Sequence, residues 1–278
     1  EFIKGSSKGS GGSIRAGDNS VVDLKLFKAE EVSTENSGGF LLVGKDSQIN
    51  MENGEYVQTT AEANGGAIAL GQDCTMIAVN TAFNLTTGRM GGGAIFGEGG
   101  SKITATDSEF TNCASEKGSG GALYIGDISN ATFVRGRGID NSAYGSGGFC
   151  KVGSASVLSF HGFEMEGNMA TQNSGGCINA DSGVQLTCSN NNVASNSAKS
   201  YGGAVYARST ASVLLENVIS SSNEVREGFG GYIYIGDGST VNVDSGRIED
   251  CTAYGDAGSI SLGTNGQFSL QTAQILGS

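Results

Sequence analysis

The sequence predicts an all-β fold, a single right-handed parallel β-helix of about ten coils. Three observations predict it. A glycine pair recurs at a fixed spacing along all 278 residues, a short alternating apolar run follows each pair, and Gly, Asp, Asn and Ser turns separate the apolar runs. The clearest copy is Gly120-Gly121-Ala122-Leu123-Tyr124-Ile125-Gly126. A unit repeated at a constant period indicates one supersecondary element stacked on itself.

The period is 27 or 28 residues from the first copy to the last. In the tenth copy Ala257 replaces the first glycine of the pair. The second glycine, used below as the marker of each coil, stands at Gly12, Gly39, Gly66, Gly93, Gly121, Gly148, Gly176, Gly203, Gly231 and Gly258. Because this spacing is unbroken, residues 1–278 are predicted to form one continuous domain with no linker.

The first strand of each coil follows the marker. The residues two and four places after it are apolar in nearly every coil, as Leu123 and Ile125 are, whereas the residue between them varies. Alternation with a period of two is typical of a strand with one buried face. The variable column should therefore face outward; it comprises Arg15, Leu42, Ala69, Phe96, Tyr124, Lys151, Asn179, Tyr206, Tyr234 and Ser261.

Two further strands complete the predicted coil. Apolar residues recur ten and twelve places after the marker, as Leu158 and Phe160 do, and again near place seventeen, as Phe110 and Met165 do. Three short strands leave no room for a helix in the period. Each coil can bury its apolar edge only against its neighbours, and parallel crossovers are right-handed by strong preference.

One coil departs from the template. It carries Arg135-Gly136-Arg137-Gly138 where the others place an apolar residue, and we expect Ile139 to compensate one place later. Both ends of the sequence are in phase with the repeat and show no polar capping segment. We therefore expect a segment of a longer solenoid, or a unit that stacks end to end on its own copies.

Composition narrows the partners and the compartment. The net charge of −12 argues against nucleic acid and against anionic membrane surfaces. No apolar run approaches the length of a membrane span, so membrane contact is expected only through an anchor or barrel domain outside this sequence. We expect an extracellular or cell-surface protein. The sequons at Asn84 and Asn130 are glycosylation sites only if a eukaryotic host secretes the chain.

The six cysteines show no metal-binding spacing. Cys150 and Cys188 fall in interior columns, where a free cysteine acts as a small apolar residue. Cys150 and Cys177 lie in adjacent coils but one column out of register, which leaves a disulfide between them as a minor alternative. The remaining cysteines are Cys74, Cys113 and Cys251.

The complete coil pattern resembles a known repeat. Val193-Ala194-Ser195-Asn196-Ser197-Ala198 precedes Gly202-Gly203-Ala204-Val205, and Phe110-Thr111-Asn112-Cys113 precedes Gly120-Gly121-Ala122-Leu123. This looks like the "GGAI and FxxN" repeat of the chlamydial polymorphic membrane proteins. The resemblance implies a surface-exposed adhesin passenger exported by an autotransporter barrel.

Enzyme chemistry is not expected. Polysaccharide cleavage on a β-helix would need clustered Asp, Arg and Lys on one outer strand face. The outward column offers Arg15 and Lys151, five coils apart, and we expect no carboxylate beside them. His161 is expected on the surface without an assigned nucleophile, and Glu164 and Glu166 should both point to solvent.

No cofactor is expected either. Asp18, Asp46 and Asp73 fall in the turns of successive coils, where a ladder of carboxylates could hold calcium. Aspartate also suits turns for conformational reasons, and we favour that role.

The candidate binding face is the outer side of the first strand. Phe96 and Tyr124 form one aromatic group, and Tyr206, Tyr232 and Tyr234 form a second. Phe40, Leu42 and Phe149 are expected to extend the same face. Contiguous exposed aromatic rings are typical of contact surfaces, although stacked rings also stabilise a sheet by themselves.

These observations predict a non-enzymatic adhesin-type β-helix that binds a protein or glycan on a cell surface. The main alternative is a subunit of an extracellular filament or matrix fibre, assembled from copies of itself through uncapped coils. A polysaccharide-active enzyme is the third.

Overall fold

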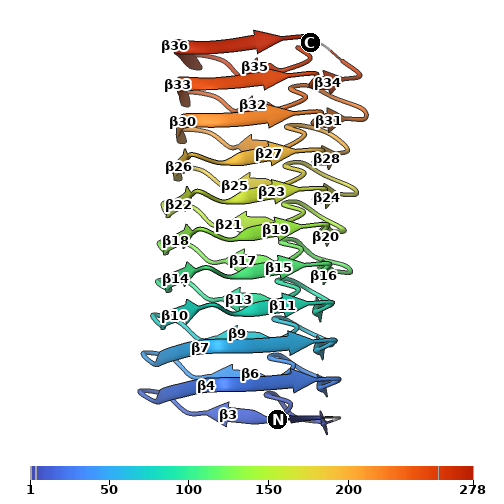
Figure 1. The fold of residues 1–278 in the computed structure, drawn as a ribbon, viewed down its shortest axis with the longest axis vertical. Coiled ribbons are helices and arrows are strands. Elements are labelled where there is room, and N and C mark those ends of the chain that lie inside the picture. The colour runs from blue at the N-terminus through green and yellow to red at the C-terminus, as the bar shows by residue number, and fades with distance from the viewer. Residues whose placement is uncertain (1, 4, 256, 278) are drawn as a thin grey trace.

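The protein is a right-handed parallel β-helix of about ten coils, described by a computed structural model for residues 2–3, 5–255 and 257–277 (Figure 1). Every strand pairing within these ranges is parallel and joins neighbouring coils at offsets of 27 or 28 residues. The predicted fold class is confirmed. Among the described residues, no helix is long and apolar enough to cross a membrane.

Sheet C contains the strand that follows each glycine pair. Its strands have three residues, with the first and third facing the core in most coils. They are β3 (Ile14–Ala16), β6 (Leu41–Val43), β9 (Ile68–Leu70), β13 (Ile95–Gly97), β17 (Leu123–Ile125), β21 (Cys150–Val152), β25 (Ile178–Ala180), β29 (Val205–Ala207), β32 (Ile233–Ile235) and β35 (Ile260–Leu262).

Sheet A combines the second and third predicted strands in one sheet. In the end coils they run on as a single ten-residue strand, and in the middle coils a short bend separates them. The strands are β1 (Phe2–Ile3), β4 (Val21–Glu30), β7 (Gln48–Val57), β10 (Thr75–Val79), β11 (Ala82–Asn84), β14 (Lys102–Thr106), β15 (Glu109–Thr111), β18 (Asn130–Val134), β19 (Arg137–Ile139), β22 (Val157–His161), β23 (Glu164–Glu166), β26 (Gln185–Ser189), β27 (Asn192–Ala194), β30 (Ser212–Ser221), β33 (Thr240–Glu249) and β36 (Gln267–Leu276).

Sheet B forms the remaining side from two-residue strands, which the periodicity did not reveal. They are β2 (Ser6–Ser7), β5 (Ser33–Thr34), β8 (Thr60–Ala61), β12 (Thr87–Gly88), β16 (Ala114–Ser115), β20 (Ser142–Ala143), β24 (Met169–Ala170), β28 (Ser197–Ala198), β31 (Glu224–Val225) and β34 (Thr252–Ala253). The coil therefore has three sides, one for each sheet, and the second and third predicted strands share one of them.

The glycine pair makes the corner between sheets B and C. Gly120, the first glycine of its pair, has φ of +70°, which is in the left-handed region that side chains rarely adopt. Ala257, which replaces this glycine in the last coil, has φ of +61° and carries the corresponding strain. Because the chain turns at this corner, the residue just after the marker also faces inward, as buried Ala122 and Leu123 show.

Stacked aromatic rings fill much of the core. The ring centroids of Tyr56 and Phe83 are 4.7 Å apart, and those of Phe83 and Phe110 are 4.9 Å apart, with the planes nearly parallel in both pairs. A cluster of rings continues this stack through the middle coils and consists of Phe133, Phe149, Phe160 and Phe163. Aromatic pairs of this kind stabilise a fold beyond the area they bury.

The irregular coil is compensated differently from our prediction. Gly138 occupies the buried position between Phe110 and Met165, whereas Ile139 is half-buried and pairs with Thr111 and Glu166 on the outer side. A Cβ atom on Gly138 would lie 2.7 Å from the ring of Phe149. The space left by the glycine is thus filled by Phe149, and the expectation for Ile139 was wrong.

The cysteines lie in the core as free thiols. All six cysteines are free and buried, so no disulfide joins Cys150 to Cys177. The interior placement predicted for Cys150 and Cys188 is confirmed. Burial raises the pKa of Cys113 and of Cys188 to about 12, so these thiols stay protonated near neutral pH.

Candidate binding face on sheet C

The outward residues of sheet C form a single file along the helix axis. One residue per coil contributes, because each strand has three residues and only its middle one faces out. Parallel pairing joins the six members of this outer column directly, in the order Phe96, Tyr124, Lys151, Asn179, Tyr206 and Tyr234. Five steps of about 4.8 Å make the outer column about 24 Å long.

Aromatic rings occupy both ends of the outer column. At one end Phe96 and Tyr124 stack with centroids 4.9 Å apart and planes inclined by 20°. At the other end Tyr206 and Tyr234 stack with centroids 5.6 Å apart and an angle of 13°. Tyr201, from the turn before β29, lies 4.8 Å from Tyr234 by ring centroids, so the second group is broader.

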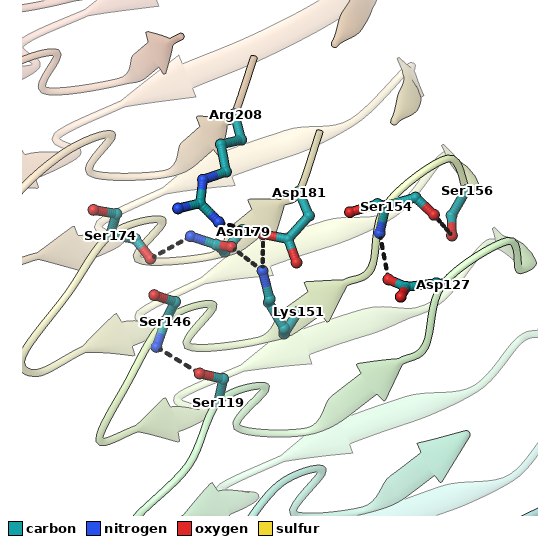
Figure 2. A network of polar contacts seen from close by, with 10 residues as sticks. All are labelled: Ser119, Asp127, Ser146, Lys151, Ser154, Ser156, Ser174, Asn179, Asp181 and Arg208. Atoms are coloured by element: carbon teal, nitrogen blue, oxygen red, sulfur yellow. Dashed lines mark hydrogen bonds and ion pairs between the residues drawn. The ribbon is translucent and has the colours of Figure 1, made fainter. Parts of the chain in front are cut away.

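A polar cluster separates the two aromatic groups. The Lys151 ammonium nitrogen lies 2.5 Å from Oδ1 of Asp181 and donates a hydrogen bond of 2.7 Å to Oδ1 of Asn179 (Figure 2). Although Lys151 points outward, only 13% of its side chain is exposed, and Asn179 is 4% exposed. An ordinary surface lysine extends into solvent. Lys151 is instead held in a defined position by Asp181 and Asn179.

The prediction that no carboxylate accompanies Lys151 was wrong. Asp181 lies one coil further on, in the turn directly after β25, and its side chain reaches back to the lysine. The sequence carries a signal for this contact, because Asp181 is two residues after Asn179, the direct partner of Lys151 in the sheet. Column-by-column comparison missed it because a turn residue belongs to no strand column.

Arg208 completes the polar cluster. It follows β29, and one of its terminal nitrogens lies 3.8 Å from the same Asp181 oxygen. Its side chain is 63% exposed. Two cations therefore share one carboxylate, which leaves one net positive charge at the centre of the outer column.

Burial affects the titration of the face. It lowers the pKa of the Lys151 ammonium, and the hydrogen bond to Asp181 opposes that shift. Burial also raises the pKa of the Tyr124, Tyr206 and Tyr234 hydroxyls. Around neutral pH the rings are therefore uncharged, and their hydroxyls can both donate and accept hydrogen bonds.

The polar cluster lies in a groove of about 310 Å³, which the rings of Tyr201 and Tyr206 flank. Its other lining residues supply small polar groups: Ser146, Asn173 and Ser174. A second hollow of about 410 Å³ runs beside Phe96 and Tyr124. The outer column from Phe96 to Tyr206 thus lines two hollows that combine ring faces with hydrogen-bonding groups.

The structure places the predicted face residues in two locations. Phe96, Tyr124, Tyr206 and Tyr234 are half-buried members of the outer column, and Leu42 belongs to the same file but is separated from Phe96 by Ala69. Tyr232 is only 1% exposed and lies in the core, as do Phe40 and Phe149. All three come just after the marker, where the corner turns the side chain inward, so assigning them to the face was wrong.

His161 has a neighbour that spacing alone did not assign. Its Nδ1 lies 2.6 Å from the Ser189 hydroxyl of the next coil. Ser189 pairs with Glu216 on its other side, so the serine stands between the histidine and the acid. Nucleophilic activation requires the histidine in the middle, oriented by a third group, and this order does not provide it.

The other carboxylates for which the sequence suggested a role are Glu164, Glu166 and the turn aspartates. Glu164 is half-buried and Glu166 exposed on either side of buried Met165, as expected. In the turns, Oδ1 of Asp18 accepts the Lys45 amide hydrogen at 3.0 Å. No group of three or more metal-ligating side chains occurs in the part of the chain that the structure describes.

Comparisons with protein-family models, with curated proteins and with solved structures found no match for this chain. The likeness of its repeat to that of the chlamydial polymorphic membrane proteins therefore stays a prediction.

Proposed function

We propose that this protein is a non-enzymatic extracellular or cell-surface β-helix that binds a glycan along the outer column of sheet C. One observation carries the proposal: two aromatic groups and a polar cluster between them lie in one file about 24 Å long. Sugar rings stack their C–H faces on aromatic rings while their hydroxyls need hydrogen-bonding partners. An extended chain of sugars meets both needs along this file.

The width of the face favours a glycan over a protein partner. A specific protein interface usually buries about 800 Å² on each partner, in a patch that is broad in two directions. Each strand of sheet C contributes one side chain to the outer column, and only the second aromatic group is widened, by Tyr201 from the turn before β29. A linear oligosaccharide needs only a narrow track.

The lining of the groove favours binding over cleavage. Glycoside hydrolysis commonly uses two carboxyl groups, one on each side of the scissile bond. The groove around Lys151 is lined by one carboxylate, Asp181, and that carboxylate is held by the lysine.

The resemblance to a surface-protein repeat and the net charge of −12 fit an extracellular location.

The test is a glycan-binding panel with the purified chain. We expect at least one oligosaccharide to bind, and we expect the double variant Tyr206→Ala plus Tyr234→Ala to weaken that binding about tenfold or more, since stacking on two rings is lost. Tyr254→Ala is the matched control, because Tyr254 is 86% exposed and lies outside the outer column.

Two outcomes would contradict the proposal. The first is the absence of binding to any glycan in the panel, and the second is unchanged binding by a double variant whose circular dichroism and melting temperature match those of the parent chain. Cleavage products in the incubated panel would instead favour the enzyme alternative. Rods that lengthen with concentration, seen by electron microscopy, would favour the filament alternative.

A further inference from the structure

Charge alternates along the outer column. Its centre carries one net positive charge, because Lys151 and Arg208 share the single carboxylate of Asp181. This local charge is opposite in sign to the net charge of the chain, which is −12. A local charge of opposite sign to the whole molecule indicates what the centre of the site can attract.

Both ends of the outer column carry carboxylates. Glu98 and Asp127 line the hollow beside Phe96 and Tyr124. At the opposite end, the charge of Asp237 acts on the Tyr234 hydroxyl. A uniformly anionic chain would therefore meet attraction in the middle and repulsion at both ends.

The two central cations have different roles. Lys151 is enclosed and already engaged by Asp181 and Asn179, so it fixes the geometry of the cluster. Arg208 is 63% exposed, and its ion pair with Asp181 is long, at 3.8 Å. The planar fork of a guanidinium matches the two oxygens of a carboxylate or the oxygens of a sulfate.

Resting on the proposed function, we infer that the glycan is neutral along most of its length and carries one anionic sugar, which binds at Arg208 while neutral sugars stack on the aromatic groups at either end. The shared chemistry is one anionic oxygen group, from either a carboxylate or a sulfate ester. The site would thus select for the position of a single charge within an otherwise neutral chain.

The experiment compares four versions of one oligosaccharide by titration calorimetry: neutral, with one carboxylate sugar, with one sulfate ester, and anionic at every sugar. We expect a singly charged version to bind about tenfold more tightly than the neutral one, the size of one charge-assisted hydrogen bond. Which singly charged version binds tighter identifies the source of the anion. We expect the fully anionic version to bind more weakly than either.

Arg208→Gln should remove the advantage of the singly charged version. Arg247→Gln is the matched control, because Arg247 lies in β33 of sheet A and its side chain is similarly exposed, at 53%. It should leave the preference intact.

The failures of the two proposals are distinguishable. Equal affinity for the neutral and singly charged versions, or tightest binding of the fully anionic one, would overturn this inference and leave glycan binding standing. A preference that survives Arg208→Gln would also overturn it. The absence of binding to every version would overturn both.

Discussion

Two sets of aromatic residues run along this β-helix, one inside and one outside. Tyr56, Phe83 and Phe110 stack in the core with no exposed surface. On the outer side of sheet C, Phe96 stacks on Tyr124 and Tyr206 stacks on Tyr234. In both sets the stacked partners are paired residues of neighbouring coils. The sheet imposes the stacking, and the position within the coil decides whether the rings stabilise the fold or face a ligand.

Tyr232 and Tyr234 show how narrow that decision is. They are two residues apart in one coil, which in a regular strand would put both on the same face. Tyr232 precedes β32 and is turned inward by the glycine corner, whereas Tyr234 is the middle residue of β32 and faces out. Strict alternation therefore holds only within the three residues of the strand.

The largest effect on stability is expected when Tyr232 and Tyr234 are substituted one at a time. Tyr232→Ala should lower the free energy of unfolding by about 3–5 kcal/mol, because it removes a fully buried ring from a packed core. Tyr234→Ala should change stability by less than about 1 kcal/mol while it weakens glycan binding. Chemical denaturation measures the first effect. Equal losses of stability in the two variants would show that the inside and outside assignments are wrong.

Much of the architecture follows from the sequence, because a period of 27 or 28 residues fixes the coil and the apolar columns fix the core side of each strand. The inward orientation of corner residues such as Tyr232 could not be predicted in this way, because the alternation of inward and outward residues holds only within the strand. The ion pair of Lys151 with Asp181 escapes it for a related reason: a turn side chain reaches between coils. The four aromatic members of the outer column were predicted, but the polar cluster between them was not.

An effect of intermediate size on stability is expected at Gly138, beside which the buried ring of Phe149 packs. Gly138→Ala should destabilise the protein by about 1–3 kcal/mol, because the new methyl group would lie 2.7 Å from the Phe149 ring. Gly17→Ala is the control, since a Cβ there would meet no atom within 4 Å. Melting temperatures of the two variants make the comparison. A Gly138→Ala protein as stable as its control would contradict the packing of the inner rings.

The smallest effect is expected from pH, and it concerns only the outer set. Burial lowers the pKa of Lys151 below the ordinary lysine value of 10.5, so in the pH range up to 10.5 its charge is lost earlier than that of an exposed lysine. Affinity for the singly charged glycan should fall by a few-fold over that range, as the net positive charge at the centre disappears. The raised pKa values of Tyr124 and Tyr206 keep these rings neutral over the early part of the fall.

The lowered pKa of Lys151 also affects stability, which should rise with pH where the affinity for the glycan falls. In the window between the lowered folded pKa and 10.5, the unfolded chain binds more protons, so the contribution of Lys151 to stability rises with pH. Calorimetric titration across this window gives the affinities, and Lys151→Arg, which keeps its charge, serves as the control. An affinity for the parent chain that stays constant up to 10.5 would contradict the assigned role of Lys151.

The most direct test of the outer column is a crystal structure of the chain with an oligosaccharide that carries one anionic sugar. We expect sugar rings over Tyr124 and over the Tyr206–Tyr234 stack, with the anionic group against Arg208. An oligosaccharide bound on sheet A or sheet B, or an anionic group that points away from Arg208 into solvent, would contradict the account.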